Sequence, residues 1–198
     1  MIGTLFRAGA LAIAVCVAAQ AFVTSAGARD AAVDGLWFTN PGLPENSETF
    51  SEEVNAENGN ASVTYFIDDA MAVLVIERFA AEGGIETVAD LVAEFEDIDR
   101  TRINVVTSFD DGAFGQDAAE AEPRFTGADA ARLAEHYSYP VALAEFLTGE
   151  NEDARKSFDL FIPTDAWMFR AHVTIAVDSL EDYEDQVLEW FTSMTLDD

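Results

Sequence analysis

The chain has little cysteine, lysine or histidine, and the shortage of cysteine excludes several kinds of functional site. Its 198 residues include one cysteine (Cys16), one lysine (Lys156) and two histidines. Cys16 lies in an N-terminal segment that we expect to be removed, which leaves the mature chain without cysteine. That excludes disulfides, thiolate catalysis and cysteine-based zinc sites. The hydrophobic core alone must therefore hold the fold together.

Positive charge is also scarce. Ten Lys and Arg residues face 38 Asp and Glu residues, for a formal net charge of −28. Such an excess of negative charge opposes binding to nucleic acid phosphates and to anionic membrane surfaces. It permits cations, basic proteins or small molecules as partners, although acidic residues spread this evenly are most simply a solvated surface. We therefore expect an unknown protein or small-molecule partner and no nucleic acid.

The N-terminus has the three parts of a secretory signal peptide. Arg7 supplies the positive charge, an Ala- and Val-rich stretch runs from Ala8 to about Val23, and Ala26-Gly27-Ala28 offers small residues to a signal peptidase. Cleavage after Ala28 predicts two parts, a signal peptide over residues 1–28 and one domain over residues 29–198. The expected location is periplasmic or secreted.

Two other interpretations of this segment are less favourable. A membrane anchor needs about 20 strongly apolar residues, whereas this stretch is Ala-rich and is interrupted by Gln20. Lipidation at Cys16 is disfavoured because Ile13-Ala14-Val15 provides no small residue directly before the cysteine. We therefore expect no stable membrane insertion after cleavage.

Hydrophobic periodicity divides the mature chain into strands and helices. A helix is predicted over 85–98, a helical turn over 141–148, and a C-terminal helix that begins with Ser179 as its N-cap and ends near Met194. The predicted strands cover 62–67, 71–79, 103–109, 128–139, 157–162 and 167–177. Short turns between neighbouring strands make the sheet mainly antiparallel. The predicted class is α+β, with a central, mainly antiparallel sheet covered by helices as an α/β/α sandwich.

Four features carry a resemblance to a known family. They are the Pro-containing Asn40–Pro44 segment, the Gly83-Gly84-Ile85 crossover, the Gly127–Leu133 segment, and the C-terminal strand and helix ending in Trp190-Phe191-Thr192-Ser193-Met194. In these features the chain resembles the PsbP-like, Mog1 and DcrB superfamily. The resemblance implies an α/β/α sandwich and an exported, non-catalytic binding or assembly role, without shared catalytic residues.

Two groups of residues are candidates for metal binding. His136 and His172 are both predicted to lie on strands, where they could share a metal ion with an acidic ligand, although ordinary sheet histidines are the simpler interpretation. The acidic loop 110–122 offers oxygen ligands for calcium, although the spacing is not that of an EF-hand. Its calcium candidates are Asp110, Asp111, Asp117 and Glu120.

No catalytic motif is present. The chain has no Gly-x-Ser-x-Gly, no His-Glu-x-x-His and no Gly-rich phosphate loop. We predict no catalytic residues and no cofactor, with calcium in loop 110–122 as the alternative. The leading hypothesis is an exported binding or accessory protein. A hydrolase-like enzyme using acidic residues or the two histidines, and a calcium-responsive module using loop 110–122, remain as alternatives.

Overall fold

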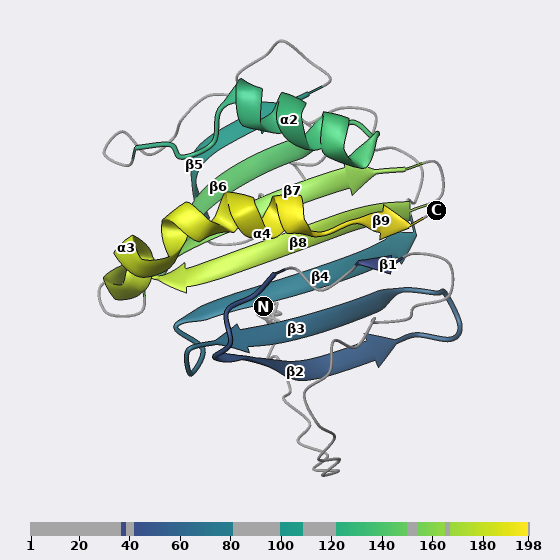
Figure 1. The fold of residues 1–198 in the computed structure, drawn as a ribbon, viewed down its shortest axis with the longest axis horizontal. Coiled ribbons are helices and arrows are strands. Elements are labelled where there is room, and N and C mark those ends of the chain that lie inside the picture. The colour runs from purple at the N-terminus through teal and green to yellow at the C-terminus, as the bar shows by residue number, and fades with distance from the viewer. Residues whose placement is uncertain are drawn as a thin grey trace, which may run out of the picture.

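The computed structural model describes residues 37–38, 42–80, 100–108, 122–149, 154–164 and 167–197. Seven strands form one antiparallel sheet, in the order β2-β3-β4-β8-β7-β6-β5 (Figure 1). They are β2 (Ser47–Val54), β3 (Ala61–Ile67), β4 (Ala72–Ala80), β5 (Arg100–Thr107), β6 (Ala142–Thr148), β7 (Arg155–Pro163) and β8 (Trp167–Ala176). Two short strands, β1 (Trp37–Phe38) and β9 (Leu196–Asp197), form a separate antiparallel pair.

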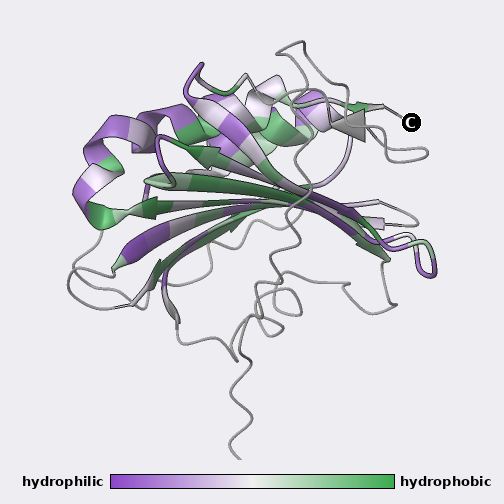
Figure 2. Cartoon of the chain, turned by 90° about the horizontal axis from the view of Figure 1, so that it is seen from below, coloured by the Kyte–Doolittle hydropathy of each residue, from purple (hydrophilic) through white to green (hydrophobic). Residues whose placement is uncertain are grey.

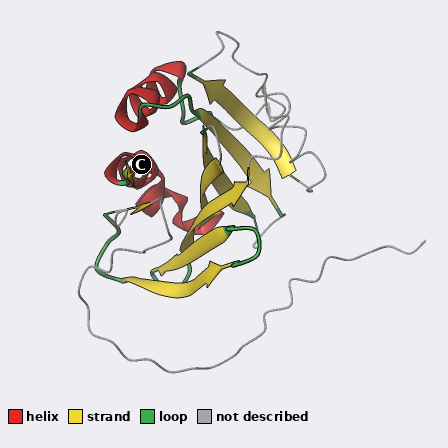
Figure 3. Cartoon of the chain, turned by 90° about the vertical axis from the view of Figure 1, so that its right-hand side faces the viewer, coloured by secondary structure: helices red, strands yellow, loops and turns green. Residues whose placement is uncertain are grey.

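The described helices all lie on one face of the sheet, as Figure 2 and Figure 3 show. They are α2 (Gly127–Tyr137), α3 (Leu180–Tyr183) and α4 (Val187–Ser193). Their apolar side chains join those of the sheet in one core, which includes Leu74, Leu133, Phe158, Val173 and Trp190. We call this the helical face of the sheet and the other side the opposite face.

Alternation of side chains along the strands separates the two faces. In β8, Phe169, Ala171, Val173 and Ile175 are buried in the core on the helical face. Arg170, His172 and Thr174, between them, point to the opposite face. A second, smaller apolar cluster forms on that face from β5 to β8, and its members are Val105, Ala142, Ala144, Phe146, Phe161 and Met168.

The hairpin predicted from residues 62–67 and 71–79 is confirmed as β3 and β4. Its turn contains three successive residues with positive φ, namely Asp68, Asp69 and Ala70. The Tyr183 hydroxyl donates a hydrogen bond to Asp68 Oδ2 at 2.7 Å, which ties this turn to α3. The strands predicted at 103–109, 157–162 and 167–177 are also confirmed, as β5, β7 and β8.

The prediction of a long strand over 128–139 is wrong, because this segment is the helix α2. Its buried residues, Ala130, Leu133 and Tyr137, have helical spacing. Thr126 and Asp129 form a capping box, in which each side chain hydrogen-bonds to the backbone N–H of the other. The capping box, rather than the apolar pattern, is the signal that marks this helix.

The helical turn predicted over 141–148 is also wrong, because residues 142–148 form β6 between β5 and β7. The C-terminal helix is present in pieces. A 3-10 turn (Val177–Ser179) precedes α3, and a second (Glu184–Gln186) separates α3 from α4. The Ser179 side chain makes no capping bond. The apolar side chains of these pieces lie against the core, since Tyr183, Val187 and Trp190 are buried.

The fold class is thus confirmed as a mainly antiparallel sheet with helices against it. A helical layer on the opposite face is not shown, and the predicted helix 85–98 and its Gly83-Gly84 crossover lie outside the described residues. The signal segment 1–28 and most of the acidic loop 110–122 lie outside them as well. Within the described part of the chain, no helix has the length and apolar character needed to cross a membrane.

Candidate functional site

A cavity of about 300 Å³ lies at one end of β2, β3 and β4, beside the loop that joins β2 to β3. Hydrogen bonds close this loop, from Asn55 N–H to the Asn60 carbonyl and from Gly59 N–H to the Asn55 carbonyl, both at 2.8 Å. The lining residues are Glu53, Val54, Asn55, Asn60, Ala61, Ser62, Glu77, Arg78 and Phe79. The cavity therefore combines two carboxylates with amide, hydroxyl and apolar groups.

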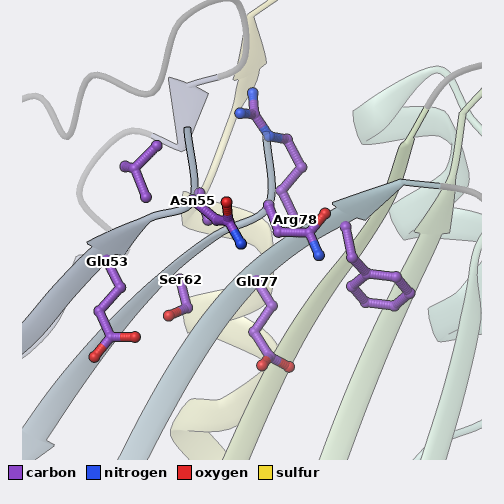
Figure 4. A pocket seen from close by; sticks show the side chains of 9 residues that line it. Glu53, Asn55, Ser62, Glu77 and Arg78 are labelled. Atoms are coloured by element: carbon purple, nitrogen blue, oxygen red, sulfur yellow. The ribbon is translucent and has the colours of Figure 1, made fainter. Parts of the chain in front are cut away.

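Strand register places the two carboxylates on either side of one hydroxyl. Glu53 pairs with Ser62 across the β2–β3 ladder, and Ser62 pairs with Glu77 across the β3–β4 ladder. All three side chains point to the same side of the sheet (Figure 4). Neighbouring strands lie about 4.8 Å apart, so the Glu53 and Glu77 backbones are roughly 10 Å apart. That spacing leaves room for a cationic group between the two carboxylates.

Arg78 lines the cavity, but its charged group points away from the two glutamates (Figure 4). Its Nη2 donates to the Gly59 carbonyl at 2.7 Å, and its guanidinium lies 4.5 Å from the centre of the Trp167 ring. Gly59 has a φ of +74°, and a Cβ at this position would lie 2.7 Å from Trp167 Cη2. Arg78 and Trp167 therefore hold the loop in place, and Arg78 does not neutralise Glu53 or Glu77.

A charged network begins at the cavity and continues across the opposite face. Arg170 pairs with Glu77 across the β4–β8 ladder, and its Nη1 lies 3.3 Å from Glu77 Oε2. Arg170 Nε donates to Asp159 Oδ1 at 2.7 Å. Asp159 is fully buried, whereas the Glu77 side chain is 34% exposed. Glu77 thus belongs both to this network and to the lining of the cavity.

The same network contains a hydroxyl, an imidazole and a carboxylate in sequence. His172 pairs with Asp159 in the β7–β8 register, and its Nδ1 lies 2.8 Å from Asp159 Oδ1. His172 Nε2 lies 2.7 Å from Thr174 Oγ1, which lies 3.3 Å from Ser157 Oγ. An ionised carboxylate can only accept, so His172 Nδ1 is the donor. Whether Nε2 accepts from Thr174 or donates to it depends on whether the imidazole is neutral or protonated.

Two opposing effects act on the Asp159 carboxyl. Burial by itself raises its pKa, but the charges of His172 and Arg170 and their hydrogen bonds outweigh burial and hold the pKa of Asp159 well below its ordinary value. Asp159 therefore stays ionised across the physiological range. Its negative charge holds both Arg170 and His172 in place on the opposite face.

The structure separates the two histidines that the sequence offered as a joint metal site. His136 lies on α2 and its Nε2 is 2.7 Å from the Met194 carbonyl oxygen, on the helical face. His172 lies on the opposite face, so the sheet stands between them. Among the described residues, no group of three or more His, Cys, Asp or Glu side chains could hold a metal ion. The calcium candidates Asp110, Asp111, Asp117 and Glu120 lie outside these residues, and calcium binding there stays a prediction.

A second buried charged cluster lies on the helical face and supports the segment that leads into α2. Glu145, fully buried on β6, accepts the backbone N–H groups of Arg124 at 2.9 Å and Phe125 at 2.8 Å. Lys156 Nζ lies 3.4 Å from Glu145 Oε2 and also pairs with Glu184. These contacts fix the segment before α2, and we assign the cluster a structural role.

Comparison with known proteins does not assign the chain to a family. No family model matches the chain, and no curated protein matches it. Solved structures share a general likeness at low identity. A protein from Bacteroides thetaiotaomicron VPI-5482 aligns at 11% identity and a TM-score of 0.43, over 83% of this chain and 46% of that one. This chain thus spans less than half of that structure.

Two further structures are similar over most of their own length. PA94 from Pseudomonas aeruginosa, a protein of unknown function, aligns at 12% identity and a TM-score of 0.38, over 79% of this chain and 86% of that one. LpqN of Mycobacterium tuberculosis, involved in cell envelope biogenesis, aligns at 9% identity and a TM-score of 0.39, over 82% and 84%. At these scores none of the three supports a function for this chain.

Proposed function

We propose that this chain is an exported, non-catalytic binding protein that takes a positively charged group in the cavity between Glu53 and Glu77. One observation carries the proposal, namely two carboxylates that flank Ser62 on the same side of a cavity. The N-terminal signal pattern supports export, and the strongly negative charge of the chain favours a cationic ligand.

The cavity suits an ammonium or guanidinium group on an apolar stem. The carboxylates and Ser62 can accept charge-assisted hydrogen bonds, which are roughly twice as strong as neutral ones. Phe79, two residues after Glu77 on β4 and on the same face, provides apolar surface for the stem. Arg170 does not cancel this preference, because Asp159 already supplies it with a buried counter-charge at 2.7 Å.

Isothermal titration calorimetry on the mature protein tests the proposal with arginine amide and its isostere citrulline amide, which differs in having an uncharged side chain. We expect arginine amide to bind at least about tenfold more tightly, because only its side chain carries the charge. Glu53→Gln and Glu77→Gln should each weaken arginine amide binding, while Glu48→Gln, an exposed change elsewhere on β2, should not. Equal binding of the two amides, or no binding of either, would refute the proposal.

A hydrolase is the second candidate, because Thr174, His172 and Asp159 reproduce a hydroxyl–imidazole–carboxylate arrangement at 2.7 and 2.8 Å. Binding ranks first because the His172 side chain is only 14% exposed and Asp159 is fully buried, which is typical of a structural network. A screen of ester and amide substrates discriminates the two. Turnover that is lost in His172→Ala and kept in the matched control His136→Ala would support the enzyme.

A further inference from the structure

We infer that β2 is a docking edge for an extended, basic segment of a partner protein, which pairs with β2 as an additional strand. Its Lys or Arg side chain then lies next to Glu53, at the mouth of the cavity. This inference rests on the proposed cation-binding function and names the kind of partner that carries the cation. Strand addition of this kind draws affinity from main-chain hydrogen bonds and specificity from side-chain pockets.

The position of β2 fits this role. It is an end strand of the seven-stranded sheet and, among the described strands, pairs only with β3 (Figure 1). Most of its side chains are exposed on both faces. Two of these exposed residues are apolar, namely Phe50, which is 56% exposed, and Val54, which is 54% exposed. An exposed edge strand offers unpaired main-chain groups to an incoming chain.

The charge of this region selects the partner. No Lys or Arg occurs from Gly42 through Glu77, whereas eight acidic residues do, and those on and around β2 are all exposed. These exposed acids are Glu45, Glu48, Glu52, Glu53 and Glu57. Natural edge strands use charge to prevent pairing, but charge of one sign repels only like-charged strands. A second copy of this chain is therefore disfavoured and a basic strand is attracted.

The acidic field also reaches the neighbouring strand. Tyr65 on β3 pairs with Thr49, and its ring packs against the core on the helical face. Burial and then the nearby Glu52 carboxylate raise the pKa of Tyr65. The acidic residues of β2 thus place negative charge on both faces, with Glu52 on the helical face and Glu53 on the opposite face. An incoming strand would meet it on both of its own faces.

The register of β2 places the docking stretch beside the cavity. The β2–β3 ladder shifts between Thr49 and Ser51, where Phe50 is the extra residue and stacks on Phe66 with ring centres 4.2 Å apart. Residues 51–54 follow without interruption, and the last two line the cavity. A strand paired here lies about 4.8 Å beyond β2, within reach of Glu53 for a Lys or Arg side chain.

A synthetic peptide of alternating Thr, Val and Arg provides the test, titrated into the mature protein by calorimetry. Successive backbone N–H groups of a strand point to opposite edges, so only one alternate set bonds to β2. We expect N-methylation of one set to weaken binding at least about tenfold and N-methylation of the other set to have little effect. Replacing Arg by citrulline should weaken binding by a similar factor.

A variant of the protein separates the edge from the cavity. Glu48→Lys combined with Glu52→Lys reverses charge on β2 at positions that do not line the cavity. We expect this variant to bind the basic peptide at least about tenfold more weakly and arginine amide within about twofold of the unmodified protein. Circular dichroism confirms that it is folded.

The outcomes distinguish the two proposals. Equal binding of the two N-methylated peptides, or full peptide affinity in the charge-reversed variant, would overturn the docking edge. If arginine amide still binds at Glu53 and Glu77 in that case, the proposed function stands without it. If neither arginine amide nor the peptide binds, both proposals fail.

Discussion

Asp159→Asn tests the energetic role of the buried network. The substitution keeps the size of the side chain but removes the charge that Arg170 and His172 face at 2.7 and 2.8 Å. Breaking a buried ion pair by removing one partner costs about 3–5 kcal/mol. Arg170 keeps Glu77 at 3.3 Å, so we expect the lower end, about 3 kcal/mol at pH 7.

The pH dependence gives a sharper test, because the folded pKa of Asp159 is lowered. A group of this kind contributes stability that is fully present above its unfolded pKa, near 3.9, and is lost as pH falls toward the folded pKa. In this range, the uptake of one proton lowers the free energy of unfolding by about 1.4 kcal/mol for each pH unit. The stability difference between the unmodified protein and Asp159→Asn should therefore shrink as the pH falls below about 4.

Urea unfolding from pH 7 to pH 3, followed by circular dichroism, measures this difference. Comparing two proteins at each pH cancels the contribution of the many other carboxylates. Glu77→Gln serves as the matched control, because its pair with Arg170 is partly exposed and should contribute no more than about 1 kcal/mol. A loss below about 1 kcal/mol for Asp159→Asn, or a difference that does not change below pH 4, would refute the assigned role of Asp159.

Three further predictions concern the loop, the charge and the N-terminus. Gly59→Ala should destabilise the protein by more than about 1 kcal/mol, because its φ is +74° and a Cβ would meet Trp167, whereas Gly127→Ala, with nothing within 4 Å, should be neutral or stabilising in the same thermal melt. The melting temperature should rise with NaCl as like charges are screened, and only an additional rise in CaCl₂ at matched ionic strength would support calcium binding to loop 110–122. N-terminal sequencing of exported protein should find Arg29 or Asp30, and a lipidated chain that begins at Cys16 would contradict the signal assignment.

Strands in which apolar and polar residues alternate clearly could be predicted from the sequence. Strands composed of residues that favour helix could not. The sequence of β8 alternates apolar and polar residues, so its two faces were predictable. Residues 142–148 are rich in Ala, Leu and Glu, which favour helix, but pairing with β5 and β7 overrides that preference. In α2 the many alanines obscure the helical period, and only Thr126 and Asp129 mark its start.

The site depends on features that a single sequence does not contain. Asp159, Arg170 and Glu77 come together through the register of three strands, and register is set by the folded sheet. The strand β2 was not predicted, because Ser47–Val54 is charged and exposed rather than alternating. His172 was named from its residue type alone, and its partner could not be identified among so many acidic residues.

The ladder between β4 and β8 also has a consequence for how the chain folds. The sheet consists of two meanders, β2-β3-β4 and β5-β6-β7-β8, and this one ladder joins them. It pairs Ala72 with Ile175 and Ala80 with Trp167, residues far apart along the chain. Contacts of such long range form slowly, because the closure of the intervening loop costs entropy first. Until they form, β4 is an exposed apolar edge, and a chain halted at that stage would aggregate through the strand that later lies inside its own sheet.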